Sequence, residues 1–370
     1  MRIRLPLLSV VLAFGLLGCG KDPAASATND PADGASAKVF KWKMVTAYPK
    51  NFPGLGLGPE NLAKLVARMS NGRLQIKVYG ANELVPPFEV FDTVSAGTAE
   101  MGHSAAYYWT GKSPAAAFFT AVPFGMTAQE RNGWLHYGGG MALWRELYAN
   151  FNLVPFAGGN TGVQMGGWFN KEINSVEDLK GLKMRIPGLG GDVLNRLGGT
   201  SVTLPGSELY TSMQTGVIDA VEWVSPYNDI ALGLHQVADY YYYPGWQEAG
   251  PNLEFTVNKQ AWDSLPDDLQ AIVEAATRAI NQDMLDEYTA RNADALTELV
   301  EQHGVQLRAF PDDVMAAIAR ESVAVKKDLA SSDPFARRVY DSMSAFQTKA
   351  GAYGRISEQS YMNARDSVAD

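Results

Sequence analysis

The chain has 370 residues, of which 46% are hydrophobic and 19% charged, so it is long enough for two domains with separate cores. Its formal net charge of −9 argues against nucleic acid as a partner, because phosphates need a basic surface. A small anionic ligand would therefore have to be held by a local cation.

The N-terminus has the pattern of a secretory signal (1–19). Arg2 and Arg4 precede an apolar run that is too short to span a bilayer as a mature helix. The segment ends at Cys19, the only cysteine of the chain, so an internal disulfide is excluded. Residues 16–19 resemble the lipobox of bacterial lipoproteins, which implies lipidation of Cys19; cleavage without lipidation remains an alternative. Residues 20–37, rich in Ala, Ser, Asp and Pro, predict a flexible tether.

Two segments of the chain predict βαβαβ units. In the first, alternating or apolar runs predict strands and helical spacing predicts helices, in the order strand 40–44, helix 59–69, strand 74–79, helix 87–96 and strand 99–103. The second unit lies within residues 179–226, with strands expected at 184–186, 202–204 and 217–221. Ligands of open α/β sheets bind outside the carboxyl ends of the strands, which directs attention to Arg185, Glu222 and Trp223.

The two units also align with each other at a constant offset of 119 residues. The offset matches Glu89 with Glu208 and Gly97 with Gly216, and it makes His103 equivalent to Glu222. A chance match between two amphipathic helices that each end in glycine is the alternative. A true repeat predicts two similar lobes whose strand ends face a shared crevice, the usual place for a small-molecule site.

The remaining segments predict the connections between the lobes. We expect a helix over 127–150, a crossing point at the glycines of 157–162, a β-strand at the tyrosine run 240–243, and a returning strand over 253–258. Residues 266–303 predict one long helix or two broken near Arg291, and two further helices follow at 312–329 and 334–355. The resulting division is lobe I at 38–160 and 253–310, lobe II at 161–252, and bracing C-terminal helices at 311–370, the last of which we expect to dock on a second copy of the chain.

Arg185 is the first candidate for ligand binding. A surface ion pair is the common fate of an arginine, but its place at a strand end, beside a glycine-rich helix start, favours a binding role. Its guanidinium can hold a carboxylate by two parallel charge-assisted hydrogen bonds. The glycines at 188–191 lack the third glycine of a dinucleotide fingerprint, so nucleotide binding is not expected.

Three oxygen-bearing residues make up a candidate cation site. Glu222 and Glu248 follow strand-like segments, and Gln164 follows the glycine crossing. Such ligands suit hard cations such as Na⁺ or Ca²⁺ rather than zinc or copper. Acids beside an anion site would repel the ligand, and a bridging cation reverses that effect.

The sequence gives little support for catalysis. Its four histidines show no metal-binding spacing, and neither a nucleophile elbow nor a cysteine of the mature domain is present. We therefore expect a binding protein and no enzyme, while a triad assembled in space remains a rival reading.

Four stretches of the chain resemble the solute receptors of tripartite ATP-independent periplasmic (TRAP) transporters, in particular an α-keto acid receptor-like subgroup. These stretches are 157–169, 179–191, 215–227 and 240–246. The resemblance implies an α/β, two-lobed periplasmic binding protein fold of type II-like architecture, with lobes joined by β-strands and long helices, and it implies TRAP membrane subunits as partners. It further implies that Arg185 binds the substrate carboxylate and that a Na⁺ or Ca²⁺ ion bridges ligand and protein. The residues implied by the resemblance are Gln164, Glu222, the Trp223 carbonyl and Glu248 for the metal, and Asn160, Trp223 and Tyr107 or Tyr108 for the substrate.

Together these observations predict a periplasmic receptor, tethered to the membrane through a lipid on Cys19. It is expected to bind a small 2-oxo or 2-hydroxy monocarboxylate, such as pyruvate or lactate, and to deliver it to a cation-driven permease. A secreted enzyme acting on a small carboxylic acid and a ligand-sensing module are the alternatives.

Overall fold

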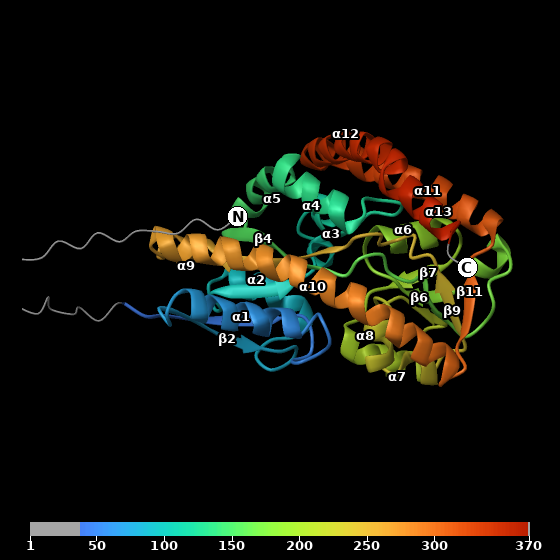
Figure 1. Ribbon diagram of the computed structural model, residues 1–370, viewed down its shortest axis with the longest axis horizontal. Helices are drawn as coiled ribbons and strands as arrows, with labels where there is room; N and C mark the ends of the chain where they lie inside the picture. Colours follow the sequence, from blue (N-terminus) through green and yellow to red (C-terminus); the bar gives the residue numbers. More distant parts are fainter. Residues whose placement is uncertain (1–37, 369–370) are drawn as a thin grey trace, which may run out of the picture. The chain divides into compact units, whose positions relative to one another are not determined.

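The computed structural model describes residues 38–368. The expected signal segment with Cys19 and the expected tether lie outside the described residues. Within the described part, none of the helices combines the length and the apolar character needed to cross a membrane. The elements are labelled in Figure 1.

A five-stranded sheet forms the centre of the first lobe, in the order β2-β1-β3-β10-β4. Strands β1, β2 and β3 are parallel, whereas β10 runs antiparallel to both β3 and β4. The bounds of these strands are β1 Phe40–Thr46, β2 Leu74–Tyr79, β3 Met101–Ser104, β4 Leu153–Asn160 and β10 Asn252–Asn258. The strands predicted at 40–44, 74–79, 99–103 and 253–258 are thus confirmed, with small shifts of their ends.

Helix α1 (Leu57–Met69) covers one face of this sheet together with the long helix α10. Its apolar stripe, including Leu62 and Val66, is buried in one cluster with residues of β1 and α10. Burial of one such side chain contributes about 1.5–3 kcal/mol. The helix ends where Asn71 and Gly72 take positive φ values of 50° and 76°, as the sequence predicts.

A six-stranded sheet forms the centre of the second lobe, in the order β11-β9-β5-β8-β6-β7. Its strands are β5 Gly167–Phe169, β6 Lys183–Arg185, β7 Thr200–Val202, β8 Ala220–Val221, β9 Tyr240–Tyr243 and β11 Gln306–Ala309. Helices α6 (Gly188–Arg196), α7 (Leu209–Gln214) and α8 (Pro226–Ala231) belong to this part of the chain. The sequence division groups residues 306–310 with the first lobe, whereas β11 pairs with β9 of the second sheet.

The internal repeat expected from the sequence is present in the fold. Strand order β2-β1-β3-β10-β4 corresponds to β7-β6-β8-β5-β9, with an antiparallel fourth strand in both sheets. Helices α2 (Val90–Ser95) and α7 begin and end 119 residues apart, and each is preceded by a 3-10 turn at the same offset. Gly97 and Gly216 follow these helices with φ values of 75° and 71°.

One polar contact is repeated as well. The Glu100 carboxylate accepts a hydrogen bond from the backbone N–H of Lys43 at 2.7 Å, and Asp219 accepts from the N–H of Lys183 at 2.9 Å. The acids lie 119 residues apart and each binds the strand that its own strand pairs with. A chance match of two amphipathic helices would not also repeat this hydrogen bond, so the contact favours a true repeat.

Three connections join the lobes. The chain passes from β4 to β5, returns from β9 to β10, and passes again through α10 (Asp267–Glu301) to β11. Helix α10 is continuous, so the alternative of two helices broken near Arg291 is wrong. Its 35 residues span about 50 Å, which is long enough to run from one lobe to the other (Figure 1).

The end of β4 requires glycine. Gly159 has a φ of 138°, and a Cβ there would come within 2.3 Å of the Met284 sulfur on α10. Gly158 lies against the β10 backbone, where a Cβ would approach Glu254 to within 2.5 Å. The glycines of the crossing point thus allow β4 to lie close to both α10 and β10.

The helix predicted over 127–150 is two helices, α4 (Ala128–Tyr137) and α5 (Gly140–Ala149). Gly139 between them has a φ of 90°, and a Cβ on Gly140 would lie 2.7 Å from the Trp134 ring. The turn brings Trp134 and Trp144 to stack on Phe119 at centroid distances of 5.9 and 5.2 Å. Aromatic packing and a left-handed glycine therefore end the first helix.

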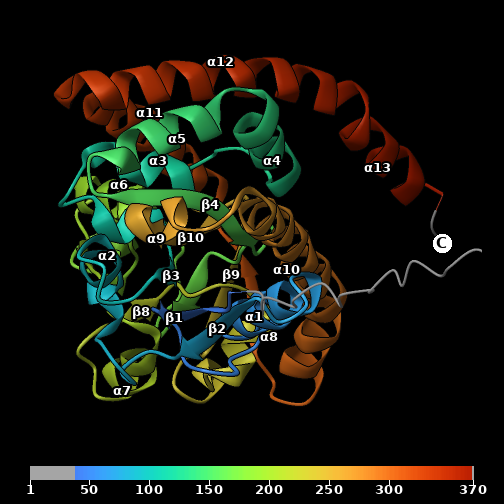
Figure 2. The ribbon, with the colours of Figure 1, turned by 90° about the vertical axis from the view of Figure 1, so that its left-hand side faces the viewer.

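The C-terminal helices are α11 (Asp312–Ser332), α12 (Pro334–Ile356) and α13 (Glu358–Asp366), the last of which the sequence analysis did not predict. Helix α12 lies across α4 and α5 (Figures 1 and 2). The Arg338 guanidinium binds the Glu146 carboxylate of α5 at 2.7 and 2.9 Å. Two short helices, α3 (Ala117–Thr120) and α9 (Lys259–Asp263), complete the set of α-helices in the described chain.

Candidate functional site

A cavity, called the cleft below, lies where strand ends of both sheets meet. It is lined by Tyr48, Leu55, Tyr107, Tyr108, Thr161, Gln164, Arg185, Trp223, Val224, Glu248, Pro251 and Leu253. Tyr48 follows β1 of the first sheet, and Arg185 ends β6 of the second. The cleft thus lies at the strand ends from which the repeat predicts a shared site.

Arg185 is 1% exposed and lies at the centre of the cleft wall. Its strand pairs on both sides, with β7 at Val202 and with β8 at Val221, so its backbone is fixed. One nitrogen, Nη1, donates to the Glu222 backbone oxygen at 2.6 Å and to Glu222 Oε2 at 3.0 Å, and Nε donates to the Leu204 oxygen at 3.2 Å. The other terminal nitrogen, Nη2, is buried without a hydrogen-bond partner among the described residues. A buried guanidinium with one free donor fits an anionic ligand.

Two buried carboxyl groups lie beside this guanidinium. Burial raises the pKa of Glu222 well above its usual value, and the nearby charge of Glu248 raises it further, while Arg185 acts in the opposite direction. Burial also raises the pKa of Glu248 to about 7, again against the effect of Arg185. One guanidinium therefore does not fully compensate two buried acids, and a second positive charge would stabilise their ionised forms.

Gln164 brings an acceptor oxygen to the same place. Its backbone N–H donates to the backbone oxygen of Glu248 at 3.1 Å, and its side-chain nitrogen donates to Thr161 Oγ1 at 3.1 Å. The side-chain oxygen Oε1 of Gln164 and Oε1 of Glu222 are both buried without a partner in the described part of the chain. A hard cation prefers oxygen ligands of this kind, so the two unpartnered oxygens and the carboxylates of Glu222 and Glu248 form a suitable set of ligands for one. Residues 38–368 contain no group of three or more His, Cys, Asp or Glu able to hold a metal, so the donor set depends on amide and carbonyl oxygens as well.

Trp223 closes one side of the cleft. The Arg185 guanidinium lies 5.1 Å from the centroid of its ring. On the other side the indole meets Tyr48 and Phe52 of the first lobe edge-on, each at 6.4 Å. Trp223 thus positions the arginine and joins the two lobes.

Tyr107 and Asn160 differ in their relation to the cleft. Tyr107 lines it and packs against Tyr108 at a centroid distance of 4.8 Å, and its Cβ lies 3.3 Å from the position that a Cβ on Gly188 would take. Asn160 is fully buried but is not among the lining residues. Its side chain donates to the Gly250 oxygen at 3.2 Å and accepts from the Gly162 N–H at 2.9 Å, which ties together the two crossing segments.

The structure therefore brings Arg185, Tyr107, Trp223, Gln164 and Glu248 to one cavity wall, with Glu222 bonded to Arg185. Sequence reasoning missed several lining residues. Tyr48 lies two residues after the carboxyl end of β1, so the strand-end rule could have found it. Leu55, Pro251 and Leu253 carry no comparable signal, because apolar residues in loops are common.

The lobes also contact each other beside the cleft. Asn228 of α8 donates from its side chain to the Pro53 oxygen of the first lobe at 2.8 Å, and it accepts a hydrogen bond from the Tyr288 hydroxyl of α10. The Phe124 N–H of the first lobe also donates to the Trp246 backbone oxygen of the second at 2.8 Å. The lobes are thus held together by polar contacts that do not involve the cleft residues.

Comparisons with known proteins agree with this geometry. The bacterial extracellular solute-binding protein family 7 (DctP) matches residues 46–333. A monocarboxylate 2-oxoacid-binding periplasmic protein of Nostoc sp. is 48% identical over 336 residues, which cover 91% of this chain and 92% of that protein.

Two solved structures are similar over most of the chain. One is a TRAP periplasmic solute-binding protein of Pseudoalteromonas atlantica with bound sodium and pyruvate, and it is 44% identical, with a TM-score of 0.86 and coverage of 88% of this chain and 99% of that chain. The other, from Colwellia psychrerythraea with bound calcium and pyruvate, is also 44% identical, with a TM-score of 0.86 and coverage of 88% and 100%. The expected two-lobed α/β fold is confirmed. The chain belongs to family 7 of the bacterial extracellular solute-binding proteins, the DctP family, and is a TRAP-type solute receptor.

Proposed function

We propose that this receptor binds a small 2-oxo or 2-hydroxy monocarboxylate, of which pyruvate and lactate are the simplest examples, and delivers it to a cation-driven membrane permease. The observation that carries the proposal is the buried Arg185 guanidinium: it lines a cavity built from both lobes, and its Nη2 has no hydrogen-bond partner among the described residues. The proteins with bound pyruvate, at 44% identity, support the same substrate class.

We assign the substrate carboxylate to Arg185 and the ligand's remaining contacts to Tyr107 and the wall formed by Trp223. Asn160 would join them only if its side-chain nitrogen turned from the Gly250 oxygen toward the ligand. Arg185 supplies a planar pair of donors once its Nη1 turns from Glu222 toward the ligand. The aromatic rings of Tyr107 and Trp223 exclude water, which strengthens the charge-assisted bonds. Their bulk also restricts the substrate to a short side chain.

A sodium or calcium ion fits beside the arginine. Gln164, Glu222, Glu248 and the Trp223 carbonyl would hold it, and the free acceptors Gln164 Oε1 and Glu222 Oε1 support this assignment. The ion would supply positive charge for the carbonyl or hydroxyl oxygen of the substrate. Glu222 and Glu248 must both be ionised for this role, although burial raises the pKa of each.

Opening of the lobes is required for ligand exchange. The free space at the centre of the cleft is about 10 Å³, which is roughly the room for a single water. We propose that lobe I (38–160 and 253–305) and lobe II (161–252 together with β11) separate about the crossing strands, while the helices of 311–370 brace them. Binding of the acid then favours the closed arrangement, because closure lets the acid contact residues of both lobes, Tyr107 from the first and Arg185 from the second.

Calorimetric titration with pyruvate tests the proposal, once in buffer with calcium, once with sodium, and once with chelator and a large organic cation in their place. We expect saturable binding that is lost with Arg185→Ala and weakened without the small cations. Lys183→Ala is the matched control, because Lys183 is exposed on the same strand. Pyruvate binding that survives Arg185→Ala would remove the arginine from the site, and indifference to both cations would make Glu222 and Glu248 structural.

We propose no enzymatic step for the cleft, in keeping with the receptor family. Bound pyruvate should be recovered chemically unchanged after prolonged incubation with the protein, as read by NMR. Turnover would instead support the rival reading of a secreted enzyme. A receptor that passes its ligand to a sensory partner would bind pyruvate equally well, so uptake by cells lacking the receptor distinguishes transport from sensing.

Two attachments complete the proposal. We propose that Cys19 is lipidated and tethers the receptor to a membrane, which mass spectrometry of the mature N-terminus tests directly.

We also propose that α12 and α13 pair two copies of the chain, because Tyr353, Ile356 and Tyr361 are each about 70% exposed there. Light scattering of a chain truncated after residue 350 should then report a monomer where the full chain gives a dimer.

A further inference from the structure

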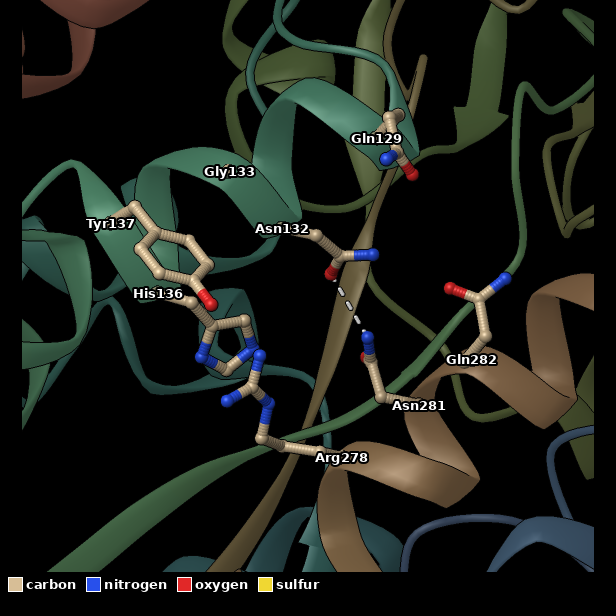
Figure 3. A pocket seen from close by; sticks show the side chains of 8 residues that line it. All are labelled: Gln129, Asn132, Gly133, His136, Tyr137, Arg278, Asn281 and Gln282. Atoms are coloured by element: carbon tan, nitrogen blue, oxygen red, sulfur yellow. Dashed lines mark hydrogen bonds between the residues drawn. The ribbon is translucent and has the colours of Figure 1, made fainter. Parts of the chain in front are cut away.

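A second concave site lies on the outer side of the first lobe, between α4 and α10. This pocket, called the α4–α10 groove below, has a volume of about 360 Å³. It is lined by Gln129, Asn132, Gly133, His136, Tyr137, Arg278, Asn281 and Gln282 (Figure 3). None of these residues lines the cleft, so the groove is a separate site.

The lining of the groove is polar and contains no acid, although the chain as a whole carries a net charge of −9. Four of its eight members are side-chain amides, which both donate and accept hydrogen bonds. The only permanent charge among them is Arg278. Such a lining matches a small polar molecule that carries one negative charge.

Arg278 lies at one end of the groove, with its side chain extended toward His136 and the Tyr137 hydroxyl (Figure 3). In the described part of the chain its guanidinium forms neither a hydrogen bond nor an ion pair. Most of the other arginines have an acid within ion-pair distance, and Arg145 of the adjoining pocket binds Glu274 at 2.9 Å. The fork of Arg278 is therefore available to a carboxylate.

The electrostatics at this end favour an anion. Burial lowers the pKa of His136, and the positive charges of Arg278 and Arg145 lower it further. The imidazole is thus neutral at neutral pH and leaves the groove with one positive charge, which suits a monoanion better than a doubly charged phosphate. Arg145 is paired with Glu274, so Arg278 is the residue that attracts a carboxylate here.

The floor of the groove is rigid and connected to the crossing strand. Asn281 is 3% exposed, its amide donates to Asn132 Oδ1 at 2.9 Å, and its oxygen accepts from the Gly159 N–H at 3.1 Å. The bond between Asn132 and Asn281 joins α4 to α10 across the groove (Figure 3). The amide signal of Gly159 is therefore a reporter of events in the groove.

We propose that the α4–α10 groove is a second binding site of this receptor, for a small monocarboxylate held by Arg278. The amides of Asn132 and Gln129 contact the rest of that molecule, while the Gln282 amide donates to Asp286 Oδ1 at 2.8 Å beside them. This inference stands independently of the cleft ligand, because it uses none of the cleft residues.

NMR titration tests the proposal on the full mature protein, with calcium and one molar equivalent of pyruvate added first, so that the cleft is filled and little free pyruvate is left to compete in the groove. Acetate is the probe, and inorganic phosphate and glycerol are the comparison solutes. We expect saturable shifts of the side-chain amide signals of Asn132 and Gln129 and of the backbone signal of Gly159, with a dissociation constant of roughly 1 mM or tighter. Phosphate and glycerol should give smaller or linear shifts.

Two variants decide the role of the arginine. Arg278→Gln should weaken acetate binding about tenfold or more, since a charge-assisted pair is lost, whereas Arg278→Lys should retain part of it. Arg291→Gln is the matched control, because Arg291 is exposed on the same helix outside the groove. The proposal is overturned if acetate gives no saturable shift, if glycerol or phosphate binds as well as acetate, or if Arg278→Gln and Arg291→Gln behave alike.

Discussion

Replacing Arg185 by lysine separates the positive charge of this residue from its planar pair of hydrogen-bond donors. Lysine keeps the positive charge beside Glu222, but it lacks the planar pair of donors needed for a carboxylate. In the structure Nη1 and Nε of Arg185 donate to Glu222 and Leu204, and only Nη2 has no partner among the described residues. The substitution should therefore affect the ligand more than the fold.

The size of the effect follows from the number of bonds lost. Loss of one charge-assisted hydrogen bond to the buried carboxylate costs about 1.5–3 kcal/mol, which corresponds to a pyruvate affinity roughly ten to more than a hundred times weaker. Arg185→Ala also leaves Glu222 buried without its cation, and the cost of such an unpaired charge is about 3–5 kcal/mol. The alanine variant should thus lose both binding and thermal stability, while the lysine variant loses mainly binding.

Calorimetry with pyruvate at fixed calcium gives the affinity, and differential scanning fluorimetry of the same ligand-free samples gives the stability. The reasoning is refuted if Arg185→Lys binds pyruvate as tightly as the unchanged protein. It is also refuted if the alanine variant loses thermal stability but retains its affinity, since the arginine would then act on the fold alone.

Three further predictions concern the ion, the lobes and the crossing strand. Burial raises the pKa of Glu248 to about 7, so its contribution to stability without the ion is fully present below about pH 4.3 and is lost as pH rises through about 7; burial raises the pKa of Glu222 as well. Calcium should therefore raise the thermal midpoint more at about pH 8 than at about pH 5.5, and equal shifts would contradict this. Asn228→Ala removes two hydrogen bonds that hold the lobes together, so the pyruvate affinity measured by calorimetry should fall roughly tenfold. An unchanged affinity would show that these hydrogen bonds do not favour closure of the lobes. Gly159→Ala should lower the unfolding free energy in urea by about 1–3 kcal/mol, and by more than Gly72→Ala. Gly72 also has a positive φ, of 76°, but open space around it, so equal losses would argue against close packing of the crossing strand.

Much of the fold could be predicted from the sequence because its two halves carry the same pattern. The offset of 119 residues that aligns Glu89 with Glu208 also relates α2 to α7 and the acids Glu100 and Asp219. Short strands ending in Arg185 and Glu222 directed attention to the correct edge of the second sheet. The features that depend on local periodicity and on strand ends could therefore be predicted from the sequence.

Features that depend on tertiary packing could not be predicted from the sequence in this way. The break between α4 and α5 follows from a left-handed Gly139 and the stacking of Trp134 on Phe119, a residue outside the predicted helix. Continuity of α10 could not be decided from its apolar spacing. Strand β11 joins the second sheet only because α10 carries the chain across to β9.

The candidate site was predictable in its charged members and less so in its walls. A buried arginine beside two acids leaves a signal in residue type and position, as at Arg185, Glu222 and Glu248. Tyr48 could have been found from its place after β1. The contact of Asn228 with Pro53 joins residues 175 positions apart, and nothing local marks it.

A crystal structure of the mature protein grown with pyruvate and calcium tests the central claim most directly. We predict electron density for the acid between the two lobes, with its carboxylate on both terminal nitrogens of Arg185 and a calcium ion on Gln164, Glu222 and Glu248. Density for pyruvate elsewhere, with Arg185 still bonded to Glu222 and no ion beside it, would contradict the account.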